Sequence, residues 1–159
     1  MYRFVKRIAD LLFALVAIAF TSPLMLLLAA AIRLDSPGPV FFLQRRAGKA
    51  DTYFQIVKFR TMRTDTPADM PTHLLRSADS HITRVGRFLR KSSLDELPQL
   101  ANILAGHMSF VGPRPALWNQ DDLIALRRNN GASAIRPGLT GWAQVNGRDE
   151  LPIQVKADL

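Results

Sequence analysis

A long uncharged apolar run near the start of the chain constrains its structure more than any other feature. Residues 11–32 read LLFALVAIAFTSPLMLLLAAAI. A straight helix rises about 1.5 Å per residue, so one of this length would match a hydrocarbon core of about 30 Å. A secretory signal peptide fits poorly, because the run ends at residues 33–35 (RLD) rather than at a small-residue cleavage site. The run therefore predicts a membrane segment.

The pair Ser22-Pro23 lies at the centre of this run. Pro23 cannot donate an amide to the carbonyl of Ala19, and its ring crowds that turn of a helix. In lipid a freed carbonyl is costly unless another group satisfies it, and the hydroxyls of Thr21 and Ser22 are placed to do so. We expect a bend at residues 22–23 that separates two arms of about three turns each.

Basic residues flank the run on both sides. They are Arg3, Lys6, Arg7, Arg33, Arg45, Arg46 and Lys49. Because cytoplasmic flanks of membrane segments are the positive ones, both ends are expected to face the cytoplasm. This favours a re-entrant helix that enters the bilayer, breaks at Ser22-Pro23 and returns. The alternative is a kinked transmembrane helix, since prolines are tolerated there.

Length and charge bound the remaining possibilities. The 159 residues suggest a membrane segment at residues 1–35 and one cytosolic domain at residues 36–159. The formal net charge of +8 favours an anionic partner, namely nucleic acid, acidic lipid or a phosphorylated substrate. The chain has no cysteine, which excludes disulfides, thiolate zinc sites and cysteine nucleophiles. The three histidines lack metal-ligand spacing.

The local patterns predict an α/β domain that is mainly helical with short β-hairpins. We expect strands at residues 40–44, 53–59 and 142–145, a basic loop at 45–52, and helices at 82–91, 93–106 and 117–128. Ser93 and Glu96 have capping-box spacing, which predicts that Ser93 begins a helix. Asn146-Gly147 is the sharpest hairpin signal in the chain. Segment 82–91 is amphipathic and basic, so it suits either an anionic membrane surface or packing on a soluble core.

Two adjacent acids, Asp95 and Glu96, are the first candidates for chemistry. A carboxylate can attack phosphorus and form an acyl phosphate. A neighbouring carboxylate can hold Mg²⁺ together with substrate phosphates. The alternative is structural, because acidic residues commonly occupy the first turn of a helix.

Several basic residues are candidates for phosphate binding. Arg114 lies between Pro113 and Pro115, which restrict the backbone and suit a guanidinium held for bidentate phosphate recognition. Lys58 and Arg60 are two apart in a predicted strand and would share one face. Each of the three also has a plain alternative, a solvated surface position.

The segment RPGLTGWAQVNGR supplies further candidates. Trp142 could stack on a nucleobase, sit at the membrane interface or be a buried hairpin aromatic. Gln144 lies beside it as a second candidate for nucleotide contact. Arg136 and Arg148 flank the predicted hairpin and could reach a phosphate, or be solvated rim charges.

Taken in order, several motifs closely resemble one family. They are the Ser-Pro-broken run, KFRTM, RVGRFLRKSSLDELPQL, MSFVGPRP and RPGLTGWAQVNGR. This set is similar to that of the bacterial sugar transferase family, the monotopic polyprenyl-phosphate phosphoglycosyltransferases that initiate surface glycan assembly. The resemblance extends from residue 1 to about residue 150.

The resemblance implies a mechanism and a place in the cell. Asp95 would attack the diphosphate of a UDP-sugar, release UMP and carry a covalent phosphosugar, which polyprenyl phosphate (usually undecaprenyl phosphate) then accepts. Glu96 would help to hold Mg²⁺, Arg114 would contact phosphate, and Lys58 and Arg90 match other basic positions near the active centre. The protein would be monotopic, on the cytoplasmic face of the bacterial inner membrane, with lipids as partners and exopolysaccharide, O-antigen, capsule or glycoprotein glycan as product.

Two departures from the family pattern qualify this expectation. The family usually has an acid where this chain has His107, and relatives continue beyond the equivalent of Leu159, so a truncated C-terminal part is expected. The alternative function is a non-catalytic, membrane-tethered basic module. No nucleic-acid motif is present, so no nucleic-acid partner is expected. The sequence does not specify the sugar, and it allows a homodimer without specifying one.

Overall fold

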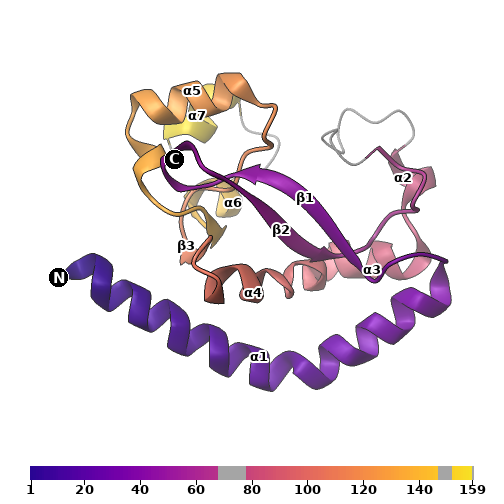
Figure 1. Ribbon diagram of the computed structural model, residues 1–159. Helices are drawn as coiled ribbons and strands as arrows, with labels where there is room; N and C mark the ends of the chain where they lie inside the picture. The colour runs from indigo at the N-terminus through magenta and orange to yellow at the C-terminus, as the bar shows by residue number, and fades with distance from the viewer. Residues whose placement is uncertain (68–77, 147–151, 159) are drawn as a thin grey trace.

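The structure is a computed structural model that describes residues 1–67, 78–146 and 152–158. The elements are α1 (Tyr2–Asp35), β1 (Phe41–Ala47), η1 (Lys49–Asp51), β2 (Tyr53–Phe59), α2 (Ala78–His81), α3 (Arg84–Ser92), η3 (Leu94–Glu96), α4 (Gln99–Leu104), β3 (Ser109–Val111), α5 (Asp121–Asn129), η4 (Ala132–Ala134), β4 (Gly138–Thr140), α6 (Trp142–Val145) and α7 (Ile153–Asp158). Helix α1 lies along one side of the molecule, and the other elements lie on its concave side (Figure 1).

Helix α1 is bent but not interrupted. It remains helical from Tyr2 to Asp35 with Pro23 inside it, and its two arms meet at an obtuse bend near the middle (Figure 1). The Ser22 hydroxyl donates to the carbonyl of Ala19, 3.0 Å away, which is the carbonyl that Pro23 leaves without its amide donor. Thr21 instead donates to Ala17 at 2.7 Å. The predicted bend is confirmed, whereas the predicted break is a kink within one helix.

Most of the apolar surface of α1 has no partner within the protein. Its exposed large apolar side chains between residues 11 and 28 are Leu12, Phe13, Leu15, Val16, Phe20, Leu24, Leu26 and Leu27. By length and composition α1 is also sufficient to cross a membrane. An exposed apolar patch of this size marks an interaction surface, and together with the length of α1 it is consistent with attachment to a membrane.

Two small sheets follow α1. Strands β1 and β2 form an antiparallel hairpin in which Phe41 is paired with Phe59 and Ala47 with Tyr53. β1 therefore extends three residues further than predicted, into the expected basic loop, because β2 offers pairing partners as far as Tyr53. Strands β3 and β4 pair in parallel, with Ser109 opposite Gly138.

The core consists of three clusters of buried apolar residues. The first joins α1, β2 and α4 through Ala14, Phe54, Ile56, Leu100, Ile103 and Met108. The second joins the other arm of α1 to β2 and α3 through Leu28, Ile32, Phe59 and Leu89. The third holds α5 and α7 through Ala116, Leu123, Ile124 and Ala157. Each arm of α1 therefore packs on a different part of the domain, which fixes the bent helix against it.

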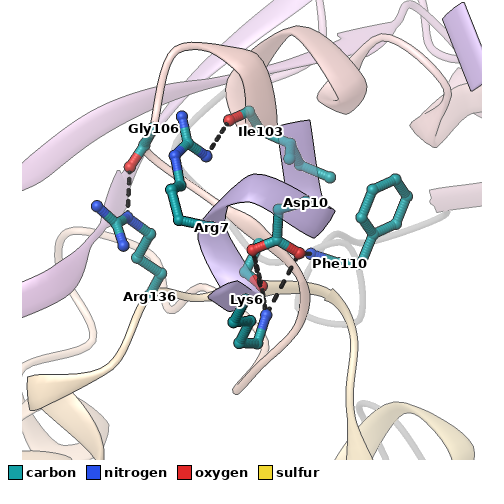
Figure 2. Close-up of polar contacts among 8 residues, drawn as sticks. Lys6, Arg7, Asp10, Ile103, Gly106, Phe110 and Arg136 are labelled. Carbon is teal, nitrogen blue, oxygen red and sulfur yellow. Dashed lines mark hydrogen bonds and ion pairs between the residues drawn. The ribbon is translucent and has the colours of Figure 1, made fainter. Parts of the chain in front are cut away.

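Polar contacts also fix the first arm of α1 (Figure 2). Asp10 is 7% exposed and accepts hydrogen bonds from the Ser109 hydroxyl at 2.9 Å and the Phe110 amide at 3.3 Å. Lys6 pairs with the same carboxylate at 3.1 Å. Arg7 donates to the carbonyls of Ile103 at 2.7 Å and Leu104 at 3.1 Å, so it caps the end of α4.

The predicted capping box at Ser93 is wrong. Ser93 has left-handed backbone angles (φ 58°) and ends α3, and its side chain makes no capping hydrogen bond to η3. The helix predicted over residues 93–106 is instead η3 followed by α4, and Gly106 (φ 85°) lies just beyond it. The tight turn between α3 and η3 overrides the local capping signal.

The predicted strand at residues 142–145 is also wrong. This segment is the short helix α6, closed by hydrogen bonds from the amides of Gln144 and Val145 to the Gly141 carbonyl. The strand of this region is β4, which pairs with β3 and leaves residues 142–145 without a strand partner. Gly147, the second residue of the predicted hairpin turn, lies outside the described residues.

We predict that Asp10→Ala lowers the free energy of unfolding by about 1–3 kcal/mol, because it removes the acceptor of two buried donors and the partner of Lys6. Thermal unfolding in detergent measures this change. The matched control is Asp79→Ala, at an exposed aspartate of α2. Equal melting temperatures for the two variants would show that Asp10 does not hold α1 in place.

Candidate active site

Three segments that are far apart in the sequence meet at Glu96. The Lys58 ammonium of β2 lies 2.6 Å from Glu96 Oε1, and Arg114 Nη1 lies 3.7 Å from the same oxygen. All three side chains are partly exposed, at 14% for Lys58, 21% for Glu96 and 30% for Arg114. A charged cluster with this exposure keeps its interactions strong and remains accessible to a solute.

Asp95 lies beside this cluster, in the same turn η3. Burial raises the pKa of Asp95 above its ordinary value, and the adjacent Glu96 charge raises it further. The positive charges of Lys58 and Arg90 oppose this shift in the Asp95 pKa. A partly desolvated carboxylate whose charge is stabilised by nearby cations is suited to nucleophilic attack on an anionic phosphate.

The pKa of Lys58 is shifted in the opposite sense. Burial lowers the Lys58 pKa, the Glu96 carboxylate raises it, and the Arg114 charge lowers it. The Glu96 carboxylate therefore offsets part of the effect of burial on the Lys58 pKa. Lys58 and Glu96 fix each other, and Lys58 stays close enough to Asp95 to influence its charge.

The backbone positions these groups from rigid elements. Lys58 belongs to β2, which the hairpin with β1 and the packing of Phe59 hold in place. Asp95 and Glu96 follow Ser93, whose left-handed conformation is uncommon for a residue with a side chain. Strained backbone of this kind persists where the surrounding structure determines it, and it is frequent at functional sites.

The loop that carries Arg114 follows β3 directly. Its entry is fixed where Gly112 and Gly138 approach each other so closely that a side chain at either would clash with backbone. The carbonyl of Arg114 accepts a hydrogen bond from Arg127 of α5 at 2.7 Å. Arg114 thus reaches Glu96 from a loop that is held at both ends.

The other predicted site residues lie in different places. Arg90 of α3 is near enough to Asp95 to lower its pKa. Arg60 does not join Asp95 and Glu96. Its guanidinium is buried and donates to the carbonyls of Pro37 at 2.5 Å and Ser36 at 2.7 Å. Arg60 follows the last residue of β2 and turns toward the end of α1, so the expected shared strand face with Lys58 is wrong.

The candidates after residue 130 are dispersed as well. Arg136 donates to the Gly106 carbonyl at 2.8 Å, next to α1 and α4 (Figure 2). Trp142 is 64% exposed on α6, so it is not a buried aromatic. The side-chain amide of Gln144 is buried, and neither its oxygen nor its nitrogen has a hydrogen-bond partner among the described residues. Arg148 lies outside the described residues.

Among the described residues, the adjacent acids Asp95 and Glu96 are the candidate metal ligands at this cluster. Within residues 1–67, 78–146 and 152–158, no group of three or more His, Asp or Glu side chains converges. Mg²⁺ commonly binds through one or two carboxylates together with water and substrate phosphates. The partly exposed Glu96, with Asp95 beside it, fits that mode, provided that a phosphorylated substrate supplies the other ligands.

Comparison with known proteins identifies the protein family. The sequence profile described as bacterial sugar transferase matches residues 1–159. The chain belongs to the bacterial sugar transferase family. It is 48% identical over 146 residues to a UDP-glucose:undecaprenyl-phosphate glucose-1-phosphate transferase from Caulobacter vibrioides, covering 89% of this chain and 54% of the relative.

Two further relatives are of similar closeness. A protein with the same name from Xanthomonas campestris pv. campestris is 45% identical over 150 residues, which are 92% of this chain and 31% of the relative. A UDP-N-acetylgalactosamine-undecaprenyl-phosphate N-acetylgalactosaminephosphotransferase from Aeromonas hydrophila is 43% identical over 150 residues, 91% of this chain and 34% of the relative. The chain thus spans about half or less of the length of these three relatives.

Four side chains that hold the segments around this candidate site had no structural contact assigned from the sequence, although two of them had been counted as flanking charges. They are Arg7, Asp10, Arg46 and Arg127. The spacing of Lys6 and Asp10, one helical turn apart, was a signal for the first arm of α1. No pattern in the sequence pointed to the contacts of Arg46 and Arg127 with this loop, because the loop acceptors are backbone carbonyls. His107 stacks on Phe54, with ring centroids 5.6 Å apart, and so has a packing role.

We predict that Lys58→Met raises the pKa of Asp95, because it removes a positive charge that favours the carboxylate. As the pH falls, Asp95 would then lose its charge at a higher pH than in the unsubstituted protein. Carbon-13 NMR of labelled aspartate in nanodiscs, with Asp95→Asn for assignment, measures the titration. Arg128→Met, which removes a cation paired with Asp51, is the control and leaves the titration unchanged. An unchanged or lower pKa in Lys58→Met would contradict this electrostatic account.

Proposed function

We propose that this chain transfers a phosphosugar from a UDP-sugar to polyprenyl phosphate and releases UMP. The observation that supports this most strongly is the geometry at Glu96, where Lys58 and Arg114 converge beside the partly buried Asp95. An acidic nucleophile surrounded by cations suits a diphosphate substrate, which brings negative charge that the cations stabilise. The names of the related proteins describe sugar-phosphate transfer to undecaprenyl phosphate.

In the first step a carboxylate oxygen of Asp95 forms a bond to the sugar-bearing phosphorus of the donor. The bond from that phosphorus to the bridging oxygen breaks, and this oxygen leaves as part of UMP. Lys58, Arg90 and Arg114 stabilise the negative charge of the phosphoryl oxygens. The result is a phosphosugar bound covalently to Asp95.

In the second step a phosphate oxygen of the polyprenyl phosphate attacks the same phosphorus. The bond between phosphorus and Asp95 breaks, which restores the carboxylate and yields a polyprenyl diphosphosugar. Two successive displacements at one carboxylate allow a soluble donor and a lipid acceptor to use the same site in turn.

A magnesium ion is part of this proposal. Glu96, and Asp95 before it reacts, would hold it together with donor phosphates, and it would supply Lewis-acid stabilisation of the phosphoryl oxygens and of the UMP leaving group. Glu96 keeps its position through Lys58 at 2.6 Å, so this chain itself orients the carboxylate. Lys58 also moderates the negative charge of the acidic pair before a substrate arrives.

The membrane segment positions this chemistry. The bent α1 packs on the domain with both arms and leaves apolar side chains of its middle exposed. We propose that α1 enters the cytoplasmic leaflet of the bacterial inner membrane as a re-entrant, monotopic anchor. The phosphate of a polyprenyl acceptor lies at the headgroup level, so such an anchor brings acceptor and Asp95 together. The excess positive charge attracts anionic headgroups as well as the donor.

We predict that Asp95→Asn reduces UMP release to the background rate, because an amide does not attack phosphorus. UMP is measured with undecaprenyl phosphate and Mg²⁺ in nanodiscs, across a panel of UDP-sugars that includes glucose and N-acetylgalactosamine forms. Asp79→Asn is the matched control and releases UMP at the unsubstituted rate. If Asp95→Asn turned over normally, the nucleophile would be another residue.

We also predict that both ends of α1 are on one side of the membrane. The chain has no cysteine, so a single cysteine placed at the exposed position Tyr2 or Gln55 is the only thiol of its variant. Its labelling shows on which side of the membrane that position lies. In sealed vesicles a membrane-impermeant thiol reagent would label both positions or neither. Labelling of one position without the other would show that α1 spans the bilayer.

A further inference from the structure

The loop that carries Arg114 contains two prolines and therefore lacks two backbone hydrogen-bond donors. Pro113 and Pro115 have no amide proton, so the loop has few donors of its own, and its carbonyls must find donors elsewhere. In this structure four successive carbonyls are satisfied by other segments. The Gly138 amide bonds to Pro113 at 2.9 Å, and the Ala47 amide bonds to the carbonyl of Ala116 at 2.9 Å.

Two arginines satisfy the carbonyls between these. Arg127 Nη1 donates to the carbonyl of Arg114 at 2.7 Å. Arg46 Nη1 donates to the carbonyl of Pro115 at 3.0 Å. The loop is therefore held from β1 on one side and α5 on the other, while the Arg114 guanidinium extends to Glu96.

Arg127 is a buried charged side chain whose acceptor in this loop is a neutral carbonyl. It is 8% exposed, and its Nε has no hydrogen-bond partner among the described residues. Desolvation alone lowers the pKa of the Arg127 guanidinium to about 10, so it remains charged at neutral pH. A buried cation that meets a neutral carbonyl is costly for stability. If this contact served folding alone, an uncharged side chain would be buried at a lower cost in free energy.

We propose that Arg127 is a positioning residue, which holds the backbone of Arg114 so that the Arg114 guanidinium stays at Glu96 and faces the donor diphosphate. This inference rests on the proposed function for its catalytic consequence, but the contact itself does not. The guanidinium of Arg114 has many rotamers, so the fixed points available to the protein are its carbonyl and the two prolines. Arg127 secures the carbonyl from the last turn of α5, a helix that itself packs on α7 through Leu123, Ile124 and Ala157.

The first test measures the loop directly, whether or not the chain is active. Hydrogen exchange of the peptide that contains residues 112–117 is followed by mass spectrometry in nanodiscs. Arg127→Met accelerates exchange at Gly112 and Leu117, whose amides donate to the Thr140 carbonyl and the Gln120 side chain, by at least about tenfold, because the loop opens more easily. Arg127→Lys, which keeps the charge and one donor, gives an intermediate rate. Arg128→Met is the matched control and leaves exchange unchanged, since Arg128 is exposed and pairs with Asp51.

The second test separates positioning from general stability. We predict that Arg127→Met lowers kcat/KM for the UDP-sugar by about 10- to 100-fold, since small displacements at a reacting centre have effects of this size. Arg127→Lys recovers part of this loss. In an Arg114→Ala background, Arg127→Met lowers kcat/KM by less than about threefold more, because its effect is transmitted through Arg114.

Each result has a defined meaning. An equal loss with and without Arg114 would overturn the proposal, since it would show that Arg127 acts through stability or through another group. Unchanged exchange in Arg127→Met would overturn it as well. If the unsubstituted chain releases no UMP from any donor, the proposed function fails, while hydrogen exchange still decides whether Arg127 holds the loop.

Discussion

The ion pair between Lys58 and Glu96 is the interaction on which the site depends. It joins the β1–β2 hairpin to the turn η3 at 2.6 Å, and Arg114 approaches the same carboxylate from a third segment. Each charge has been partly removed from water, so loss of one partner would leave the other poorly solvated. This mutual dependence fixes the direction of Glu96 and keeps Asp95 among cations, which is the electrostatic condition for a carboxylate to meet a diphosphate.

Placement of that cluster depends in turn on helix α1. The helix contributes Ala14 to one core cluster and Leu28 and Ile32 to another, so the bend at Pro23 lets one helix follow the whole length of the domain (Figure 1). Asp10 fixes the helix to the start of β3, and β3 leads into the Arg114 loop. Helix α1 is therefore tied by the hydrogen bonds of Asp10 to the strand that precedes the Arg114 loop (Figure 2).

Much of the secondary structure was readable from the sequence, because its signals are local. The apolar run, the proline bend with its Ser22–Ala19 hydrogen bond, and the strand at residues 53–59 all agree with the structure. The errors arose where tertiary contacts override local preference. Ser93 has the spacing of a helix cap, but it closes α3 in a left-handed conformation.

For the site, the residue types were predictable and their partners were not. The two acids and Arg114 stood out by type and by the flanking prolines, and the structure brings them together with Lys58. Arg60 looked equivalent to Lys58, but β2 ends at Phe59, and the Arg60 guanidinium bonds to carbonyls after α1 instead. Contacts of guanidinium groups with backbone carbonyls leave no trace in the residue types of the acceptors.

The central claim is that Asp95 becomes covalently attached to a phosphosugar, and mass spectrometry tests it most directly. The purified protein in nanodiscs would be incubated with Mg²⁺ and a UDP-sugar without acceptor, then quenched and digested. We predict that the peptide containing Asp95 gains the mass of one sugar phosphate and loses it when undecaprenyl phosphate is added. A protein that releases UMP and transfers the phosphosugar to undecaprenyl phosphate while Asp95 never carries this adduct would contradict the account.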